Sequence, residues 1–249
     1  MLDRWRDHLA GGVIPRPESD LHEDDTKWMY ARTSSLAVVG LGAAREHLHA
    51  VRLLVDAKQL FPSAVSTLAR AALVGAAQTV WILAPVEHPE RLRRSLSVAR
   101  EDYHWHIRFG EYVLSKDNVA EPTPMAPEQL DRLRLRHQQV SAMLDNLGGA
   151  IKINISDTLL PAALEATSSD PEFRAQVMMR WRSMSASAHS LLWEQFGHTG
   201  TSIHDTDSDG IGLVVVGGDV ARLAMDYFSA FQVASTGWRL LAKRTGLVF

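Results

Sequence analysis

The sequence has no cysteine, little net charge and no long apolar run, and each absence excludes a class of protein. Without cysteine there is no disulfide, thiolate nucleophile, cysteine-ligated zinc or iron–sulfur cluster. A net charge of −3 provides no global attraction to nucleic acid or anionic lipid, so such binding would depend on a local site. No uninterrupted apolar stretch approaches the roughly 18 to 20 residues of a membrane span, and the charged opening MLDRWRDHLAGG is unlike a signal peptide. We therefore expect a soluble, cytoplasmic protein with no membrane partner.

What the chain does contain is the hydrophobic periodicity of helices. With 46% hydrophobic and 22% charged residues among 249, it can bury a large core. Apolar residues recur at helical spacing. Prolines such as Pro62 and capping residues such as Asp219 mark the boundaries of the helices. The sequence predicts an all-α fold, with one bundle-like domain of about six helices over 34–249 and an irregular leader over 1–33. The expected helices cover 36–61, 63–84, 89–115, 128–147, 170–196 and 219–246.

The run HDTDSDG at 204–210 resembles the start of a calcium-binding EF-hand loop. Its three aspartates match loop positions 1, 3 and 5, which supply side-chain oxygens. Position 12, however, is Val216, which has no side-chain oxygen, and the residues after the run have the character of a strand. Three aspartates followed by glycine are also typical of a solvated turn. We predict a short β-hairpin before the last helix, with 201–203 paired to 211–216.

Two Glu-x-x-His pairs, Glu46 with His49 and Glu101 with His104, have the spacing that di-iron carboxylate bundles use on a helix. Those bundles also need carboxylates from two further helices, and the central helix over 63–84 contains none. The pairs are equally explained as hydrated polar stripes. A helical-bundle metal enzyme remains an alternative, but we assign no metal ligand and no cofactor.

The helix over 170–196 carries polar residues on a face that is otherwise apolar. Arg182, Ser185 and His189 follow helical spacing, and the neighbouring stripe is apolar too, which predicts a mostly buried helix. A buried polar group without a partner costs about 1–3 kcal/mol, so these side chains need partners. Arg70, alone in the apolar central helix, has the same requirement. We expect Arg70, Ser185 and His189 either to orient two core helices or to form a pocket for an anionic group.

The segments LARAALVGAAQTVWIL and, about a hundred residues later, RWRSMSASAHSLLW resemble a group of actinobacterial helical proteins of unknown function. That group is similar to the HEPN (higher eukaryotes and prokaryotes nucleotide-binding) superfamily. In active HEPN ribonucleases an arginine, followed after four to six residues by a histidine, meets the scissile phosphate, often across a dimer. The resemblance implies that Arg182 and His189 are catalytic and that the ligand is RNA or a nucleotide. In the pocket interpretation of the polar cluster, Arg70 and Ser185 are the binding residues. Only its position on the penultimate helix favours the pair Arg182 and His189. Three other pairs share the spacing: Arg16 with His22, Arg100 with His106, and Arg132 with His137.

Three functions follow from these observations. The first is a helical binding or interaction protein without chemistry of its own, since non-catalytic HEPN-like proteins are common. The second is a metal-independent ribonuclease or nucleotide-handling enzyme of the defence or toxin type, and the third is the metal enzyme. We also expect a homodimer, with Trp181, Trp193 and Trp238 as anchors of its interface.

Overall fold

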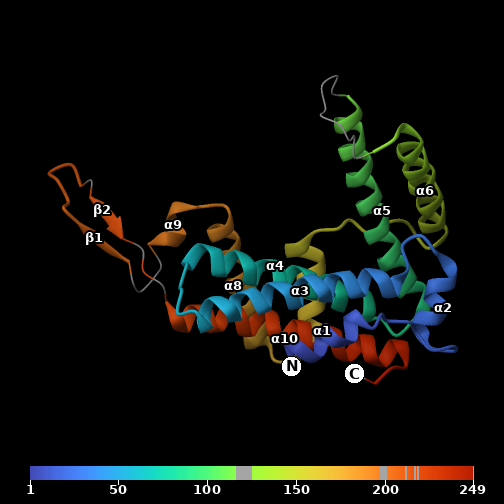
Figure 1. The fold of residues 1–249 in the computed structure, drawn as a ribbon, viewed down its shortest axis with the longest axis horizontal. Coiled ribbons are helices and arrows are strands. Elements are labelled where there is room, and N and C mark those ends of the chain that lie inside the picture. The colour runs from blue at the N-terminus through green and yellow to red at the C-terminus, as the bar shows by residue number, and fades with distance from the viewer. Residues whose placement is uncertain (116–124, 197–200, 211, 216, 218, 249) are drawn as a thin grey trace.

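The computed structural model describes residues 1–115, 125–196, 201–210, 212–215, 217 and 219–248, and all of its regular structure except one hairpin is helical (Figure 1). This confirms the predicted all-α class. In chain order the elements are α1 (Leu2–Ala10), α2 (Asp20–Lys27), α3 (Thr33–Asp56), α4 (Pro62–Leu83), α5 (His88–Leu114), α6 (Pro127–Asn146), a π-helical turn (Ile155–Leu159), α7 (Leu160–Thr167), α8 (Pro171–Ala188), α9 (Leu192–Gln195), β1 (Ser202–His204), β2 (Leu213–Val215) and α10 (Val220–Thr245).

Six long helices, α3, α4, α5, α6, α8 and α10, occupy the segments in which the sequence predicts helix. Two of the expected caps are present, since Asp170 Oδ1 accepts a hydrogen bond from Glu172 N at 2.9 Å and Asp219 Oδ1 one from Arg222 N at 3.1 Å. The described residues also form three shorter helices that the sequence did not predict, α1, α2 and α7, and the single helix expected over 170–196 is divided into α8 and α9. Short helices depend on tertiary contacts more than on their own periodicity, so a sequence pattern detects them poorly.

Residues 1–33 are not the irregular leader that we expected. They contain α1 and α2, and Ser19 caps α2 by accepting a hydrogen bond from His22 N at 3.3 Å. Trp5 of α1 and Leu21 of α2 are buried in the main hydrophobic core. The expectation was wrong because the glycines and prolines that indicated a loop are confined to the connection between the two helices.

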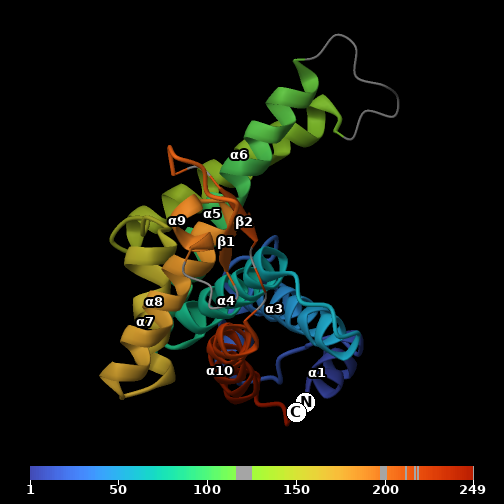
Figure 2. The same ribbon diagram turned by 90° about the vertical axis from the view of Figure 1, so that its left-hand side faces the viewer.

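The central helix is α4, which packs against α3 and α10 and also against α7 and α8 (Figure 1; Figure 2). α3 and α4 cross closely at two glycines: a Cβ on Gly40 would lie 2.7 Å from the Gly75 carbonyl oxygen. Thr79 Oγ1 donates to the Ala37 carbonyl oxygen at 3.1 Å across the same contact. Among the described helices α4 alone is long and apolar enough to cross a membrane, and 61% of that stretch is buried inside the protein.

Arginines from α5 and α10 close the carboxyl end of α4, where helical carbonyls lack partners in their own helix. Arg94 donates to the Trp81 carbonyl oxygen at 2.9 Å. Arg244 donates to the Leu83 carbonyl oxygen at 3.2 Å. Positive charge is also favoured at this end of the helix dipole, so these contacts hold α5 and α10 against α4.

The same end of the bundle contains a buried ion pair between α2 and α5. Arg91 and Asp24 are each 1% exposed, and Arg91 donates to both carboxylate oxygens, at 2.9 and 3.2 Å. His88 Nδ1 also contacts Asp24. One turn earlier, Asp20 accepts a hydrogen bond from Arg244 at 2.5 Å. Burial raises the pKa of Asp20, but this hydrogen bond and the charges of Arg91 and Arg244 outweigh burial and place the pKa below its ordinary value.

The helices α5 and α6 form a hairpin, here called the arm, that extends away from the bundle (Figure 1; Figure 2). The base of α5 packs against α2, α3 and α4, and α6 packs along α5. A second hydrophobic cluster, which includes Leu96, Leu130 and Val140, fills the seam between them. Gly110 makes room at the outer end of this seam, since a Cβ there would lie 3.1 Å from Leu130 Cδ1.

A two-stranded antiparallel hairpin of β1 and β2 precedes α10, as predicted. Of the residues expected to pair, Ile211 and Val216 lie outside the described part of the chain. The run at 204–210 begins at His204, the last residue of β1, and its other residues lie in the connecting loop, where Asp209 N donates to Asp207 Oδ1 at 3.0 Å. This is the local hydrogen bond of an aspartate turn, so the turn interpretation of the run is the one that the fold supports.

Candidate functional site

The central helix and α8 meet at two of the four predicted site residues. Arg70 Nε donates to Ser185 Oγ at 3.0 Å, and the Arg70 guanidinium lies 4.7 Å from the centre of the Trp181 ring. Both polar side chains are partly buried. The hydrogen bond and the cation–π contact give Arg70 the partners that its position in an apolar helix requires. The contact therefore orients two core helices whether or not it also binds a ligand.

Arg182 and His189 lie apart from this buried contact. Both side chains are exposed, and neither has a hydrogen-bond or ion-pair partner among the described residues. α8 ends at Ala188, so His189 follows the last helical residue. The expectation of a buried polar strip is wrong for these two residues, because α8 is buried on one face only and the strip lies at the edge of that face.

The tryptophans proposed as dimer anchors differ in exposure. Trp181 and Trp238 are 5% and 4% exposed and belong to the core of the single chain. Trp193, in α9, is 60% exposed. The apolar pattern of a helix predicts that one face of the helix is buried, but it does not say whether the surface that covers this face belongs to the same chain. Here the same chain covers Trp181 and Trp238, so their interpretation as interface residues was wrong.

A buried charge cluster, which the sequence analysis missed, joins α4, α8 and α10. Asp226 is fully buried and accepts hydrogen bonds from Arg180 Nε at 2.6 Å and Ser66 Oγ at 3.1 Å. Burial raises the pKa of Asp226, and the nearby arginine and serine offset only part of that effect. Asp226 and its neighbours hold α10 against two helices that lie far away in the sequence.

The cluster continues into α9 through a second buried carboxylate. Glu194 is 1% exposed, forms an ion pair with Arg222, and accepts hydrogen bonds from Ser187 Oγ at 2.7 Å and Ser183 Oγ at 3.2 Å. Burial, together with the charge of Arg180, lowers the pKa of Arg222. Ser183 and Ser187 are one turn apart on α8, and this spacing was the only sequence signal for the cluster. Arginines hold both carboxylates, and the cluster joins α4, α8, α9 and α10, which suits a structural role.

The Glu-x-x-His pairs form no metal centre within the described part of the chain, where no third His, Asp or Glu joins either pair. Glu46 is exposed and His49 is partly buried. Glu101 accepts a hydrogen bond from Trp105 Nε1 at 2.8 Å, and the His104 ring lies edge-on to Trp105. Glu101 and His104 are therefore engaged by an aromatic side chain.

An aromatic stripe lies on the outward face of α5 and consists of Trp105, Phe109 and Tyr112. These residues are 63%, 51% and 63% exposed, and their i, i+4, i+7 spacing puts them on one side of the helix. The opposite side of α5, with buried Tyr103 and Gly110, faces the seam with α6. The three rings leave on the order of 400 Å² exposed, within the range of the largest apolar patches on monomeric proteins.

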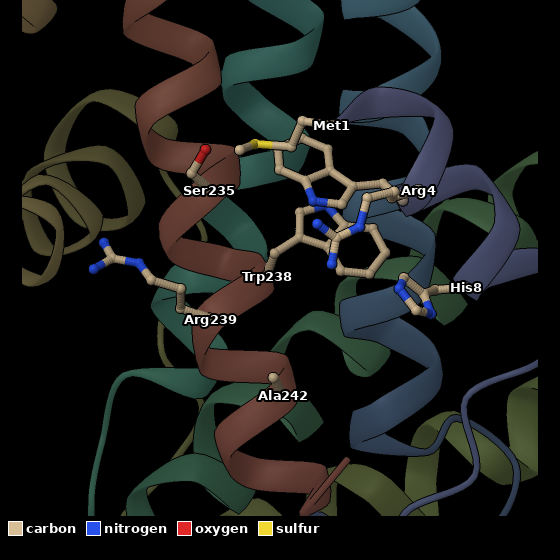
Figure 3. A pocket seen from close by; sticks show the side chains of 8 residues that line it. Met1, Arg4, His8, Ser235, Trp238, Arg239 and Ala242 are labelled. Atoms are coloured by element: carbon tan, nitrogen blue, oxygen red, sulfur yellow. The ribbon is translucent and has the colours of Figure 1, made fainter. Parts of the chain in front are cut away.

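A hollow of about 280 Å³ opens where α1 packs on α10 (Figure 3). Below it, the Trp5 ring stacks against Trp238, with ring centres 5.3 Å apart, and against Phe231, at 5.6 Å. Arg4 and Arg239 are among the residues around it, and no Asp or Glu is among the described residues that line it. The hollow combines apolar walls with positive charge, which suits a ligand that has an apolar body and one anionic group.

No protein-family model, curated protein or solved structure matches the chain. The choice of site therefore rests on geometry. The Arg70–Ser185 contact and the buried charge cluster join helices of the bundle to one another. The aromatic stripe and the hollow face solvent and can accept a partner.

Proposed function

We propose that the chain is a HEPN-like helical interaction protein, without chemistry of its own, that forms a homodimer through the aromatic stripe of α5. The observation that carries the proposal is the exposure of Trp105, Phe109 and Tyr112 on one face of an arm that extends from the bundle. Exposed aromatic side chains grouped in this way are typical of interface centres. The hydrogen bond from Trp105 to Glu101 holds the largest ring in place, which reduces the entropy lost on binding.

The stripe has the self-complementarity that a two-fold symmetric dimer requires. Arg108 is exposed and lies between Trp105 and Tyr112 on the same face of α5. If two antiparallel copies of α5 meet about an axis between residues 108 and 109, Trp105 of each copy faces Tyr112 of the other. The same axis places Arg108 opposite Phe109 of the second copy. These are an aromatic pair and a cation–π pair, both favourable when water is excluded.

The exposed area also matches a dimer. Two stripes contribute roughly 800 Å², about half of the roughly 1,600 Å² that a stable interface buries. Side chains that flank the stripe along α5 supply the remainder. A second copy of the chain is therefore a sufficient partner for this face.

The test is the mass of the protein in solution by light scattering and sedimentation velocity at micromolar concentration. The wild type should have twice the 27.6 kDa mass of the chain. Trp105→Ala should weaken the dimer about 30-fold or more, as expected for a central aromatic anchor. The proposal places the interface on α5 and not at Trp193, which the sequence analysis expected as an anchor. Trp193→Ala, which removes a similarly exposed indole from α9, is therefore the matched control and should leave the dimer intact. A monomeric wild type, or equal weakening by both substitutions, contradicts the proposal.

A second candidate is the metal-independent ribonuclease or nucleotide-handling enzyme. The observation in its favour is that Arg182 and His189 are both exposed and so accessible to a phosphate group. If this function is correct, the purified protein cleaves short RNAs in the presence of a metal chelator. His189→Ala then abolishes cleavage and leaves the dimer mass unchanged. Absence of cleavage by the wild type would favour the interaction protein.

A further inference from the structure

The hollow between α1 and α10 has a floor and walls that suit an apolar group. Trp5 and Trp238 contribute stacked indoles, and Ala242 leaves space where a larger side chain on α10 would fill the hollow. The volume of about 280 Å³ lies just below the usual range of roughly 300–1,000 Å³ for pockets that hold drug-sized molecules. A ligand of this hollow is therefore small, and stacked indoles favour a planar ring.

Within the described part of the chain, no carboxylate forms an ion pair with Arg4 or Arg239. The acidic residues of α1 are engaged elsewhere, since Asp3 binds Arg52 at 3.3 Å and Asp7 binds Arg6 at 2.9 Å. Arg4 has no hydrogen-bond or ion-pair partner among the described residues. An anion at the rim would gain charge-assisted hydrogen bonds from Arg4 without competition from a carboxylate of the protein.

Further polar groups surround the same space (Figure 3). Arg4 and His8, one turn apart on α1, lie on the side of the indoles, whereas the guanidinium of Arg239 extends away from the indoles on the other side of α10. Arg239 Nη2 donates to Thr236 Oγ1 at 2.8 Å. Ser235 Oγ is buried and has no hydrogen-bond partner among the described residues. A buried hydroxyl without a partner is uncommon, and a ligand oxygen in the hollow would satisfy it.

We infer that this hollow is a binding site for a small carboxylate with an apolar, planar body. The apolar walls exclude a highly charged ligand such as a nucleoside polyphosphate, because most of its polar groups would lose water without gaining partners. A single carboxylate uses Arg4 at the rim while the ring lies over the indoles. The site is separate from the stripe on α5 and does not depend on dimerisation.

Isothermal titration of the full chain with indole-3-acetate and indole-3-acetamide tests the inference, because the two probes share a ring and differ in charge. The acetate should bind more tightly than the amide. Arg4→Gln should weaken acetate binding about tenfold and leave amide binding unchanged. Arg6→Gln, on the same helix but paired with Asp7, is the matched control and should behave as the wild type.

A second variant tests the cavity itself. Ala242→Phe should abolish binding of both probes, because the added ring fills the hollow. Equal affinity for the two probes, no binding of either at millimolar concentration, or equal effects of Arg4→Gln and Arg6→Gln would overturn the inference. Trp105→Ala should bind the acetate as the wild type does, so failure of the dimer proposal and failure of this one are distinguishable.

Discussion

Replacement of Gly40 by alanine tests the close crossing of α3 and α4. A Cβ at Gly40 would lie 2.5 Å from Thr79 Oγ1 and 2.7 Å from the Gly75 carbonyl oxygen. Neither atom can withdraw easily, because Thr79 Oγ1 bonds to the Ala37 and Gly75 carbonyl oxygens and the Gly75 carbonyl is part of α4. The two helices must separate, at a cost of about 1–3 kcal/mol for an overpacked core, to which the lost Thr79 hydrogen bond to Ala37 adds about 1 kcal/mol.

The opposing effect is the helix propensity of alanine, which favours the variant by about 1 kcal/mol. We therefore expect Gly40→Ala to lower the free energy of unfolding by about 1–3 kcal/mol, or the melting temperature by about 2–12 °C. Gly42→Ala, two residues further along α3, is the matched control. Its Cβ would meet only Leu9 Cδ1, at 3.8 Å, so this variant should gain about 0.5–1 kcal/mol. Urea unfolding measures both, and a Gly40→Ala protein as stable as Gly42→Ala would refute the close crossing.

Three further predictions concern the ends of the bundle and the hairpin. Arg91→Ala should lower the free energy of unfolding by about 3–5 kcal/mol in urea, because Asp24 would remain buried without its main partner; a loss below about 1 kcal/mol would argue against the buried pair. The pKa of Asp20 is lowered in the folded protein, so its contribution to stability is present above the ordinary value of 3.8 and is lost as the pH falls through the lowered pKa. The stability difference between the wild type and Asp20→Asn, measured by unfolding from pH 7 to pH 2, should therefore shrink at low pH, and a difference that stays constant would contradict the Arg244 contact. Millimolar calcium should not change the melting temperature, whereas a rise that Asp207→Ala abolishes would show that the hairpin loop binds calcium.

The long helices and the hairpin could be predicted because their signals are local. Apolar spacing and caps such as Asp170 and Asp219 act within a few residues, and the aspartate turn at 204–210 is stabilised by its own side chains. The partner of Arg70 could also be anticipated. An arginine alone in an apolar helix needs a polar neighbour, and Ser185 was among the few candidates on another apolar helix.

The exposure of Arg182 and His189 could not be predicted in the same way. Helical spacing places residues on a common face, but it does not say how far a neighbouring helix covers that face. The same limit applies to the tryptophans, since Trp193 is exposed and Trp238 is buried although both lie in segments that the sequence predicts to be helical.

The amino-acid sequence by itself determined the all-α class, the positions of the long helices, the hairpin and the need for partners around Arg70. Only the tertiary structure decided which helices lie side by side, that α1 and α2 join the bundle, and that α5 and α6 leave it as an arm. The buried charge cluster shows the physical reason, because Ser66 and Asp226 are 160 residues apart in the sequence and yet share a hydrogen bond. Asp20 and Arg244 are separated by 224 residues. Such contacts depend on how whole helices pack against one another, and no local pattern of residues encodes that packing.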